Sequence, residues 1–325
     1  MARALVIGGT LLIGRTLVEQ LLARGDEVVI MHRGHGTAFG SRVREIHCDR
    51  NDVKAVASAL AHEQFDVVYD NVYDWQRGTS AEQVSAAATA SAKGLRRYVF
   101  TSSVAVFAPG GPYDEDGALV PSDFANAYGA QKADSERALF ALGRTQGIPV
   151  TTIRPAFIFG PHNAFDREAF FWDRIVADRP VIIPGDGLST MQWISSRDVA
   201  RAAIAATVHD AAIGRGYNLA NVPEITQLDF VRLLARVADK EVEVVHVPRE
   251  TIAALGGGIM EPPVYFGAYL DIPPITVRNN RLRTDLELEL TSLEDGLEET
   301  FRWYAAQQRP TADFSWDEKA IAAAE

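Results

Sequence analysis

Short apolar runs alternate with longer stretches of helical periodicity through the first half of the chain. The first run, residues 4–7, leads into a glycine turn, after which Leu17, Val18, Leu21 and Leu22 share one helical face. Further strand-like runs lie at residues 27–31, 43–47, 66–69, 97–101 and 150–153, and helical stretches at 80–92 and 127–146. Because strands and helices alternate, the pattern predicts an α/β fold with a doubly wound parallel sheet that is covered by helices on both faces.

The regular alternation of strands and helices ends after about residue 161, where the elements become shorter and Pro and Gly become more frequent. Residues 197–208 return to a helical pattern and residues 216–219 to a strand pattern, so this part is expected to rejoin the main sheet. We therefore predict a sheet domain of residues 1–160 plus about 190–220 and a smaller, discontinuous C-terminal lobe of about 161–189 plus 221–310. Residues 311–325 are expected to form a loosely specified tail.

The composition favours a soluble, cytoplasmic protein. No run among the 325 residues approaches the roughly 18 consecutive apolar residues of a membrane helix, and the first apolar run is too short for a signal peptide. Cys48 is the only cysteine, which excludes an intramolecular disulfide and a multi-cysteine zinc cluster. The net charge of −11 disfavours nucleic acid as a partner. We therefore expect no metal site, no membrane association and no nucleic-acid partner.

A glycine-rich turn, GGTLLIG, follows the first strand and opens the first helix. Backbone N–H groups and a helix N-terminus at such a place can hold the pyrophosphate of a dinucleotide, although a turn of this kind can also simply join strand to helix. Leu11 stands where the pattern G-x-x-G-x-x-G has its middle glycine, and a side chain there narrows the approach of the dinucleotide. The candidate cofactor contacts in the turn are Gly8, Thr10, Leu11, Leu12 and Ile13.

The ends of the second and third strands bear on the choice of cofactor. The second strand ends in Met31-His32-Arg33-Gly34 without an acidic residue for a ribose 2′-hydroxyl, and Arg33 can instead pair with a 2′-phosphate. This favours NADP(H) over NAD(H), the alternative being that Arg33 is an ordinary exposed loop residue. Asp49 and Arg50 follow the third strand as candidate contacts to the adenosine end, and Asp49 is equally suited to cap a helix.

Three polar residues form a candidate catalytic set. Tyr128 and Lys132 lie four residues apart at the start of a predicted helix, so they share a face one turn apart. An adjacent ammonium stabilises a phenolate and lets a tyrosine exchange protons near neutral pH. Ser103 lies at the carboxyl end of the fifth strand, where a hydroxyl can polarise the reacting oxygen. Each motif alone also fits a surface helical pair or a strand terminus, and their combination favours catalysis.

Several motifs in order resemble the NAD-dependent epimerase/dehydratase family, the extended short-chain dehydrogenases/reductases. They are GGTLLIG, TSSVAVF, YGAQK, IRPAFIFGP, IPGDG, WISSRDVA and SLEDGLEETFRWY, which extend over nearly the whole chain. The resemblance implies a Rossmann-type fold with a substrate-binding C-terminal lobe, and a triad of Ser103, Tyr128 and Lys132. It also implies that Lys132 holds the nicotinamide ribose, that Pro155 lies by the nicotinamide, and that hydride passes to or from its C4 atom. The first loop is most similar to the atypical branch that includes chloroplast stem-loop-binding proteins, some of which are reported to bind RNA.

The chain departs from nucleotide-sugar members of the family at two places. Met191 stands where those members usually carry an arginine for the nucleotide diphosphate, and the expected R-x-G-D motif is replaced by the segment 272–278. Each lost charge-assisted hydrogen bond forfeits about 1.5–3 kcal/mol, which favours a less charged substrate. Candidate substrate contacts are Phe107, Asn163, Trp193 and the segment 265–269, where aromatic residues are also common in a core.

The sequence therefore predicts an NAD(P)-dependent reductase or epimerase that acts on a hydroxyl or carbonyl carbon of a sugar-like or other small molecule. The first alternative is a non-catalytic or RNA-binding protein on the same scaffold. A nucleotide-sugar dehydratase ranks lower, because Ser102 and Ser103 offer no acidic partner for the catalytic hydroxyl. The resemblance also implies a homodimer formed through the helices at 80–92 and 127–146.

Overall fold

Alternate residues of the central strands face two different hydrophobic layers. In β1 (Arg3–Ile7), Leu5 and Ile7 face one layer while Ala4 and Val6 face the other, and all four are at most 1% exposed. Burial on both faces is typical of a parallel sheet that is covered by helices. The computed structural model describes residues 1–34, 36, 38–163, 167–256, 265, 267 and 271–324, and has one sheet of seven strands at its centre.

The seven strands are parallel, in the order β12-β7-β5-β4-β1-β2-β3. The other six are β2 (Glu27–His32), β3 (Arg44–His47), β4 (Val67–Asp70), β5 (Arg97–Thr101), β7 (Val150–Pro155) and β12 (Arg215–Leu219). The winding reverses between β1 and β4, because β2 and β3 extend the sheet to one edge and the later strands to the other. The predicted Rossmann-type α/β fold is confirmed, as is the return of residues 216–219 to the main sheet.

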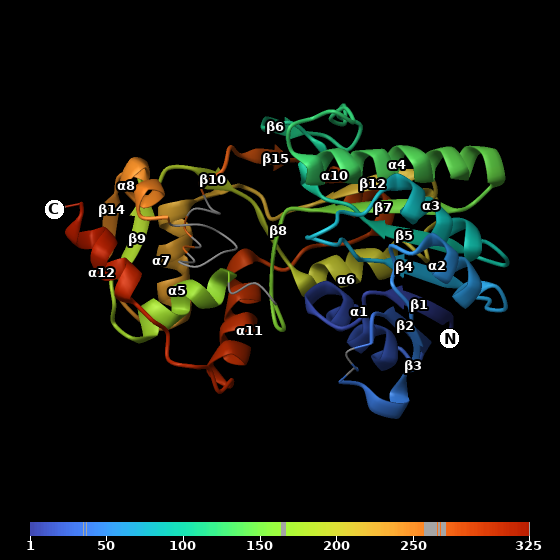
Figure 1. Cartoon of the computed structure of the whole chain (residues 1–325), viewed down its shortest axis with the longest axis horizontal. Helices are drawn as coiled ribbons and strands as arrows, with labels where there is room; N and C mark the ends of the chain where they lie inside the picture. The colour runs from blue at the N-terminus through green and yellow to red at the C-terminus, as the bar shows by residue number, and fades with distance from the viewer. Residues whose placement is uncertain are drawn as a thin grey trace.

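Helices cover both faces of this sheet (Figure 1). The first face carries α1 (Leu12–Ala23), α6 (Ser196–Ala205) and α10 (Asn280–Leu286), and the second α2 (Val53–Leu60), α3 (Ala81–Ala90) and α4 (Ala127–Gln146). Helix α4 has the predicted bounds; it begins after Asn126, whose side chain accepts a hydrogen bond from the Gly129 N–H, and ends at Gly147 with φ +73°. Helix α10 lies in the range expected for the smaller lobe, yet it packs against β12 and α6.

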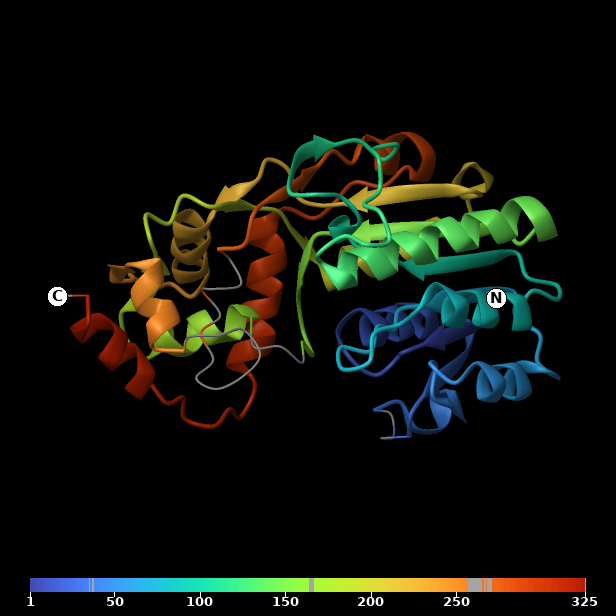
Figure 2. The same ribbon diagram turned by 45° about the horizontal axis from the view of Figure 1, so that its top comes forward.

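A second hydrophobic cluster forms the smaller lobe, which lies beyond the carboxyl ends of the strands (Figure 2). Its elements are α5 (Arg167–Val176), β9 (Val181–Pro184), α7 (Gln227–Val237), β14 (Val244–Val247), α8 (Arg249–Ala254), α11 (Leu293–Ala305) and α12 (Ser315–Ala322). Helix α12 falls in the stretch expected to be a loose tail. A buried ion pair holds it to α5, with Arg174 Nε 2.7 Å from Asp317 Oδ1.

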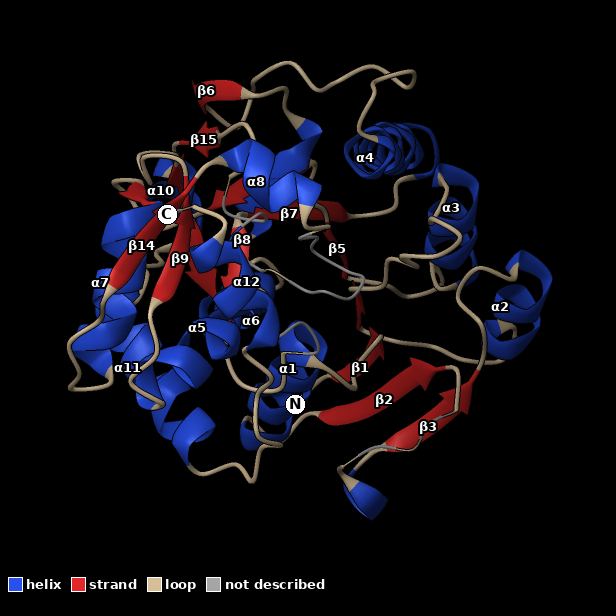
Figure 3. Ribbon diagram, turned by 60° about the vertical axis from the view of Figure 1, so that its left-hand side comes forward, coloured by secondary structure: helices blue, strands red, loops and turns tan. Residues whose placement is uncertain are grey.

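Among the described residues, three short two-stranded sheets lie outside the central sheet in addition to the pair of β9 and β14 in the smaller lobe (Figure 3). They pair β8 (Phe157–Phe159) with β11 (Trp193–Ser195), β10 (Thr190–Met191) with β13 (Ile225–Thr226), and β6 (Gly110–Tyr113) with β15 (Ile275–Val277). Short 3-10 helices complete the elements, η1 (Gly40–Arg42), η2 (Val104–Val106) and η3 (Asp210–Ala212). Among the described helices, none has both the length and the apolar character needed to cross a lipid bilayer.

Candidate active site

A cavity of about 570 Å³ opens at the carboxyl ends of the central strands. Its sheet side is lined by segments that follow β1, β4 and β5, around the point where the winding reverses. Open α/β sheets bind ligands at this edge, because the loops leave adjacent strands in opposite directions and a crevice forms between them. The opposite wall comes from the smaller lobe and its connections, and contains residues 156–158, Asn163, Arg167, 190–192 and 272–275.

The glycine turn after β1 forms one wall of the cavity. A Cβ atom on Gly8 would lie 2.4 Å from Val72 Cγ2, and one on Gly14 would lie 1.8 Å from the Gly8 carbonyl oxygen. Larger residues cannot be accommodated at such distances, so the two glycines let the turn fold tightly against the start of α1. All the predicted contacts in the turn line the cavity, namely Gly8, Thr10, Leu11, Leu12 and Ile13.

Leu11 takes the place of the middle glycine without strain in its own backbone. Its φ of −134° and ψ of 155° are extended values that any residue adopts. Its side chain is exposed, at 55%, and lines the cavity. The leucine therefore differs from a glycine at this position in the space that its side chain occupies at the cavity wall, and not in its backbone conformation.

Two buried polar atoms on the sheet side of the cavity lack a partner among the described residues. They are Asn71 Nδ2 and Ser102 Oγ, and both residues line the cavity. The Asn71 side-chain oxygen is occupied, since it accepts a hydrogen bond of 2.6 Å from Thr101 Oγ1. An unsatisfied buried donor or acceptor costs about 1–3 kcal/mol, which a polar ligand can recover. Together with the tight glycine turn, these atoms fit a dinucleotide lying along this edge of the sheet.

Lys132 is buried beneath the cavity wall, although it is a cation. Its side chain reaches back from α4 to β5, and Nζ donates a 2.7 Å hydrogen bond to the Thr101 carbonyl oxygen. Nζ also lies 4.6 Å from the centre of the Phe100 ring. Burial disfavours the charged form and lowers the pKa of Lys132 to about 8, even though the Asp70 carboxylate opposes the shift. The lysine therefore changes charge close to neutral pH.

Tyr128 lines the cavity between two aromatic side chains of the loop after β4. The Trp75 ring stacks on it with centroids 4.9 Å apart, and the Tyr73 ring meets it edge-on at 4.7 Å. Gln131, on the next turn of α4, accepts hydrogen bonds from the Tyr73 hydroxyl at 2.9 Å and from the Thr79 N–H at 3.1 Å. These contacts join the loop to the helix and fix the direction of the Tyr128 ring.

Ser103 lies between β5 and η2, on the same cavity. Its Oγ accepts a 3.1 Å hydrogen bond from the Ala105 N–H. This contact uses the oxygen as an acceptor and leaves the hydroxyl proton available for donation. The three predicted catalytic side chains, Ser103, Tyr128 and Lys132, are thus brought to one cavity, together with Pro155.

Arg33 and Asp49 belong to an ion-pair cluster at the carboxyl ends of β2 and β3, outside the cavity lining. Arg77 links the cluster, because its guanidinium lies 2.6 Å from Asp74 and 2.8 Å from Asp49. Arg33 Nη1 lies 3.4 Å from Asp74, and its side chain is 60% exposed. The Asp49 side chain also accepts a hydrogen bond from the Asn51 N–H, while the cap of α2 is Asp52. Two arginines therefore share one buried carboxylate here.

Arg50 has a structural contact in place of the predicted contact to the cofactor. Its guanidinium is 3% exposed, forms an ion pair with Asp70 and donates a 2.7 Å hydrogen bond to the Gln83 carbonyl oxygen. Asp70 in turn accepts a 2.6 Å hydrogen bond from the Tyr98 hydroxyl. Arg50 is buried against these partners and is not among the residues that line the cavity.

Of the predicted substrate contacts, Asn163 lines the cavity and two aromatic residues do not. Phe107 is fully buried and stacks on Tyr113 at 4.8 Å, and Trp193 stacks on Phe230 at 4.1 Å. Both fill the core, Phe107 directly after η2 and Trp193 from β11. In the predicted segment 265–269, residues 266, 268 and 269 lie outside the described residues, and Tyr265 is buried.

Several cavity residues were not identified from the sequence. Asn71 follows β4 at the switch point, so the rule for open sheets was a signal that could have found it. Trp75 and Arg167 gave no such signal, because they reach the cavity only through tertiary folding. Within the described lining, Lys132 and Arg167 are the charged residues.

The fold and the glycine turn define a Rossmann-type protein of the cofactor-binding class. The model of the NAD dependent epimerase/dehydratase family matches residues 4–220, and the chain belongs to this family.

Relatives with described functions are moderately similar. The chloroplast stem-loop binding protein of 41 kDa b of Arabidopsis thaliana is 29% identical over 266 residues, 76% of this chain and 67% of that protein. A trifunctional UDP-glucose 4,6-dehydratase/epimerase/reductase of the same plant is 29% identical over 231 residues, and the chain spans only 31% of its length. The structure of UDP-glucose 4-epimerase from Thermotoga maritima, solved with UDP-glucose, is 20% identical with a TM-score of 0.77 over 93% of this chain and 98% of that one. This last similarity shows the fold alone.

Proposed function

We propose that the protein is an NAD(P)-dependent oxidoreductase or epimerase that acts on a hydroxyl or carbonyl carbon of a small molecule. One observation carries this proposal: Ser103, Tyr128 and Lys132 line the same cavity as the glycine turn. A bound nicotinamide supplies hydride exchange at that place. Reduction and epimerisation differ in whether the hydride returns to the same molecule, and both use the same three side chains.

The chain itself supplies proton transfer and orientation. The Tyr128 hydroxyl exchanges a proton with the substrate oxygen, and its phenolate is stabilised by the Lys132 ammonium. Ser103 donates its hydroxyl proton to the same substrate oxygen, since its Oγ already accepts from the Ala105 N–H. With its pKa lowered to about 8, Lys132 is partly neutral at mildly alkaline pH, which makes the stabilisation sensitive to pH.

We propose a substrate that carries less charge than a nucleotide-diphosphate sugar. Met191 lines the cavity where family members that use nucleotide sugars carry an arginine, and much of the far wall is apolar. Among the described lining residues there is no aspartate or glutamate, so a dehydratase reaction has little support. The relatives named as UDP-glucose 4-epimerases support the epimerase chemistry proposed here, while the cavity lining supports a substrate with less charge than theirs.

Replacement of Tyr128 by Phe tests the catalytic assignment. The variant keeps the ring that stacks on Trp75 and loses the proton donor, so turnover should fall by about 10²–10⁴-fold. The measurement is NADPH consumption with a carbonyl compound selected by screening wild-type protein. Cofactor affinity should stay within about twofold, and full turnover in the variant would remove Tyr128 from the mechanism.

We propose a preference for NADP(H), with Arg33 and Arg77 as the partners of the 2′-phosphate. The partial exposure of both side chains supports this role, and Asp74 is the carboxylate that the phosphate has to displace. Arg33→Ala should weaken NADPH binding by about 10–100-fold, the equivalent of one charge-assisted hydrogen bond, and leave NADH binding unchanged. Titration followed by nicotinamide fluorescence measures both. Equal losses for the two cofactors would place Arg33 outside the phosphate site.

A second candidate, RNA binding on the same scaffold, is favoured by the relative that is named as a stem-loop binding protein. The net charge of −11 opposes it. Retention of a stem-loop RNA that weakens steeply with added salt would support this candidate, and absence of retention at low salt would exclude it.

A further inference from the structure

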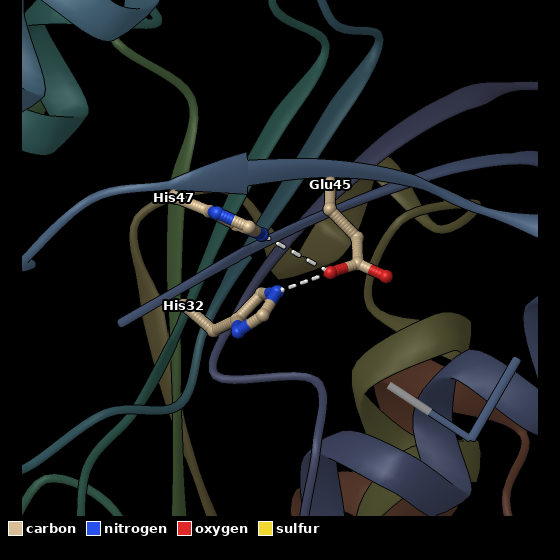
Figure 4. Close-up of side chains that lie close together, drawn as sticks. All are labelled: His32, Glu45 and His47. Carbon is tan, nitrogen blue, oxygen red and sulfur yellow. Dashed lines mark hydrogen bonds and ion pairs between the residues drawn. The ribbon is translucent and has the colours of Figure 1, made fainter. Parts of the chain in front are cut away.

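Three potential metal ligands meet at the free edge of the central sheet. His32 ends β2, His47 ends β3, and the two residues are register partners in the parallel pair. Glu45 lies two residues before His47 and so faces the same side of the sheet. Figure 4 shows both imidazole rings directed toward one carboxylate oxygen of Glu45.

The ligand atoms of the three residues lie close to the separations found around a bound metal ion. His32 Nε2 lies 2.9 Å and His47 Nε2 lies 3.3 Å from Glu45 Oε2, and the ligand atoms of all three residues lie within 4.8 Å of one another. Zinc binds nitrogen and oxygen at about 2.0–2.2 Å in a tetrahedral arrangement, which places neighbouring ligand atoms about 3.3–3.6 Å apart. Only small side-chain movements are needed for all three to bind one ion.

We propose that His32, Glu45 and His47 form a binding site for a divalent transition-metal ion of the zinc type. Two imidazoles and a carboxylate are a ligand set that suits zinc and leaves a further position for water. The His47 side chain is 64% exposed and gives the ion a route in, whereas His32, at 6%, anchors the site in the protein. This inference goes beyond the proposed reaction and does not depend on it.

The hydrogen bonds of His32 in the metal-free protein show which contacts a bound ion would replace. The Gly34 N–H donates to His32 Nδ1 at 3.1 Å, so the neutral ring carries its proton on Nε2 and donates it to Glu45. Metal binding uses the Nε2 lone pair; the proton then resides on Nδ1 and the hydrogen bond from Gly34 is lost. Gly34 has a φ of +101°, and a glycine allows this peptide to rotate. A bound ion therefore changes the hydrogen bonding of the turn that carries Arg33.

The test uses the full-length protein without a histidine tag. Isothermal titration with Zn²⁺ should show one ion per chain, and Co²⁺ should give visible absorption from a site with nitrogen ligands. His47→Gln and Glu45→Gln should each weaken Zn²⁺ binding at least tenfold, because each removes a direct ligand. The control His62→Gln removes an exposed histidine outside the cluster and should leave affinity unchanged. His47 is exposed, so its variant should fold normally, which thermal unfolding without metal verifies.

Two results would overturn the proposal. The first is absence of Zn²⁺ binding to the wild type, which means that the three residues form only a hydrogen-bonded cluster. The second is equal Zn²⁺ affinity in the wild type and His47→Gln, which places the ion elsewhere. Both are independent of cofactor binding and turnover, so they leave the proposed reaction untouched.

Discussion

Lys132 is a buried cation, so the side chain to which the proposed function assigns a chemical role also carries a cost in stability. The residue is 4% exposed, and burial lowers its pKa from 10.5 to about 8. The unfolded chain keeps this lysine charged up to a higher pH than the folded protein does. At every pH at which the unfolded chain is protonated, the cost of burying the lysine therefore lowers the free energy of unfolding. The contact with the Thr101 carbonyl oxygen and the nearby aromatic rings offset part of this cost.

We predict that Lys132→Met raises the free energy of unfolding at pH 7 by about 2–3 kcal/mol and abolishes turnover. Methionine fills a similar volume and needs no hydration, so the burial cost disappears. Urea unfolding measures the change. The exposed Lys93→Met is the matched control and should stay within about 0.5 kcal/mol of the wild type.

The stability that Lys132→Met gains over the wild type should decrease as the pH rises. Below pH 8 lysine is protonated in both states, so the whole cost is present and the variant has its full advantage. Between pH 8 and about 10.5 the unfolded state binds more protons than the folded state, and the stability of the wild type rises relative to the variant. The difference should therefore vanish near pH 10.5, and a constant difference would assign it to packing.

At the level of elements, α4 determines the geometry of the site because it carries Tyr128, Gln131 and Lys132 together. A buried pair fixes this helix to the sheet: Arg154 of β7 donates to both carboxylate oxygens of Glu136, at 2.8 and 2.6 Å. The third guanidinium nitrogen donates to the Glu115 carbonyl oxygen at 2.7 Å. The charge is thus fully paired in an interior where an unpaired one is expensive.

Glu136→Gln should lower the free energy of unfolding by about 3–5 kcal/mol, since it removes the carboxylate that pairs directly with the buried Arg154 guanidinium. The double variant Glu136→Met with Arg154→Met should recover most of that loss by removing both charges. Chemical denaturation of the wild type and both variants distinguishes the two effects. Equal stability of Glu136→Gln and wild type would mean that water or movement of α4 solvates the arginine.

The elements that the sequence predicted well are those with a strong local signal. The bounds of α4 follow from its capping residues Asn126 and Gly147, and β5 follows from the uninterrupted run 97–101. Helix α12 was missed because its signal is not local: Ala320 packs in the core of the smaller lobe, and Asp317 pairs with Arg174 of α5. The burial of Arg50 was not predicted for the same reason, because its ion-pair partner Asp70 lies on β4.

For the whole molecule, the cavity brings together residues from position 8 to position 275. The meeting of Ser103, Tyr128 and Lys132 at this cavity was predictable because their spacing reflects fixed local geometry, four residues on a helix and the end of a strand. Trp75, Arg77 and the His32–Glu45–His47 cluster were not, because strand register and loop path bring them together. Sequence periodicity indicates which face a residue occupies and not which partner it meets there.

The position of β12 at the end of the sheet has a consequence for synthesis. Strand β7 is complete at Pro155, whereas its outer neighbour β12 begins only at Arg215, after α5 and β9 of the smaller lobe and α6 of the sheet domain. While the nascent chain leaves the ribosome, the β7 edge is an open template for pairing with other chains. Arg154 places a charge on that edge, as gatekeeper residues do in strands prone to aggregation. We therefore expect the residue that anchors α4 in the folded protein also to reduce aggregation of the nascent chain before β12 is synthesised.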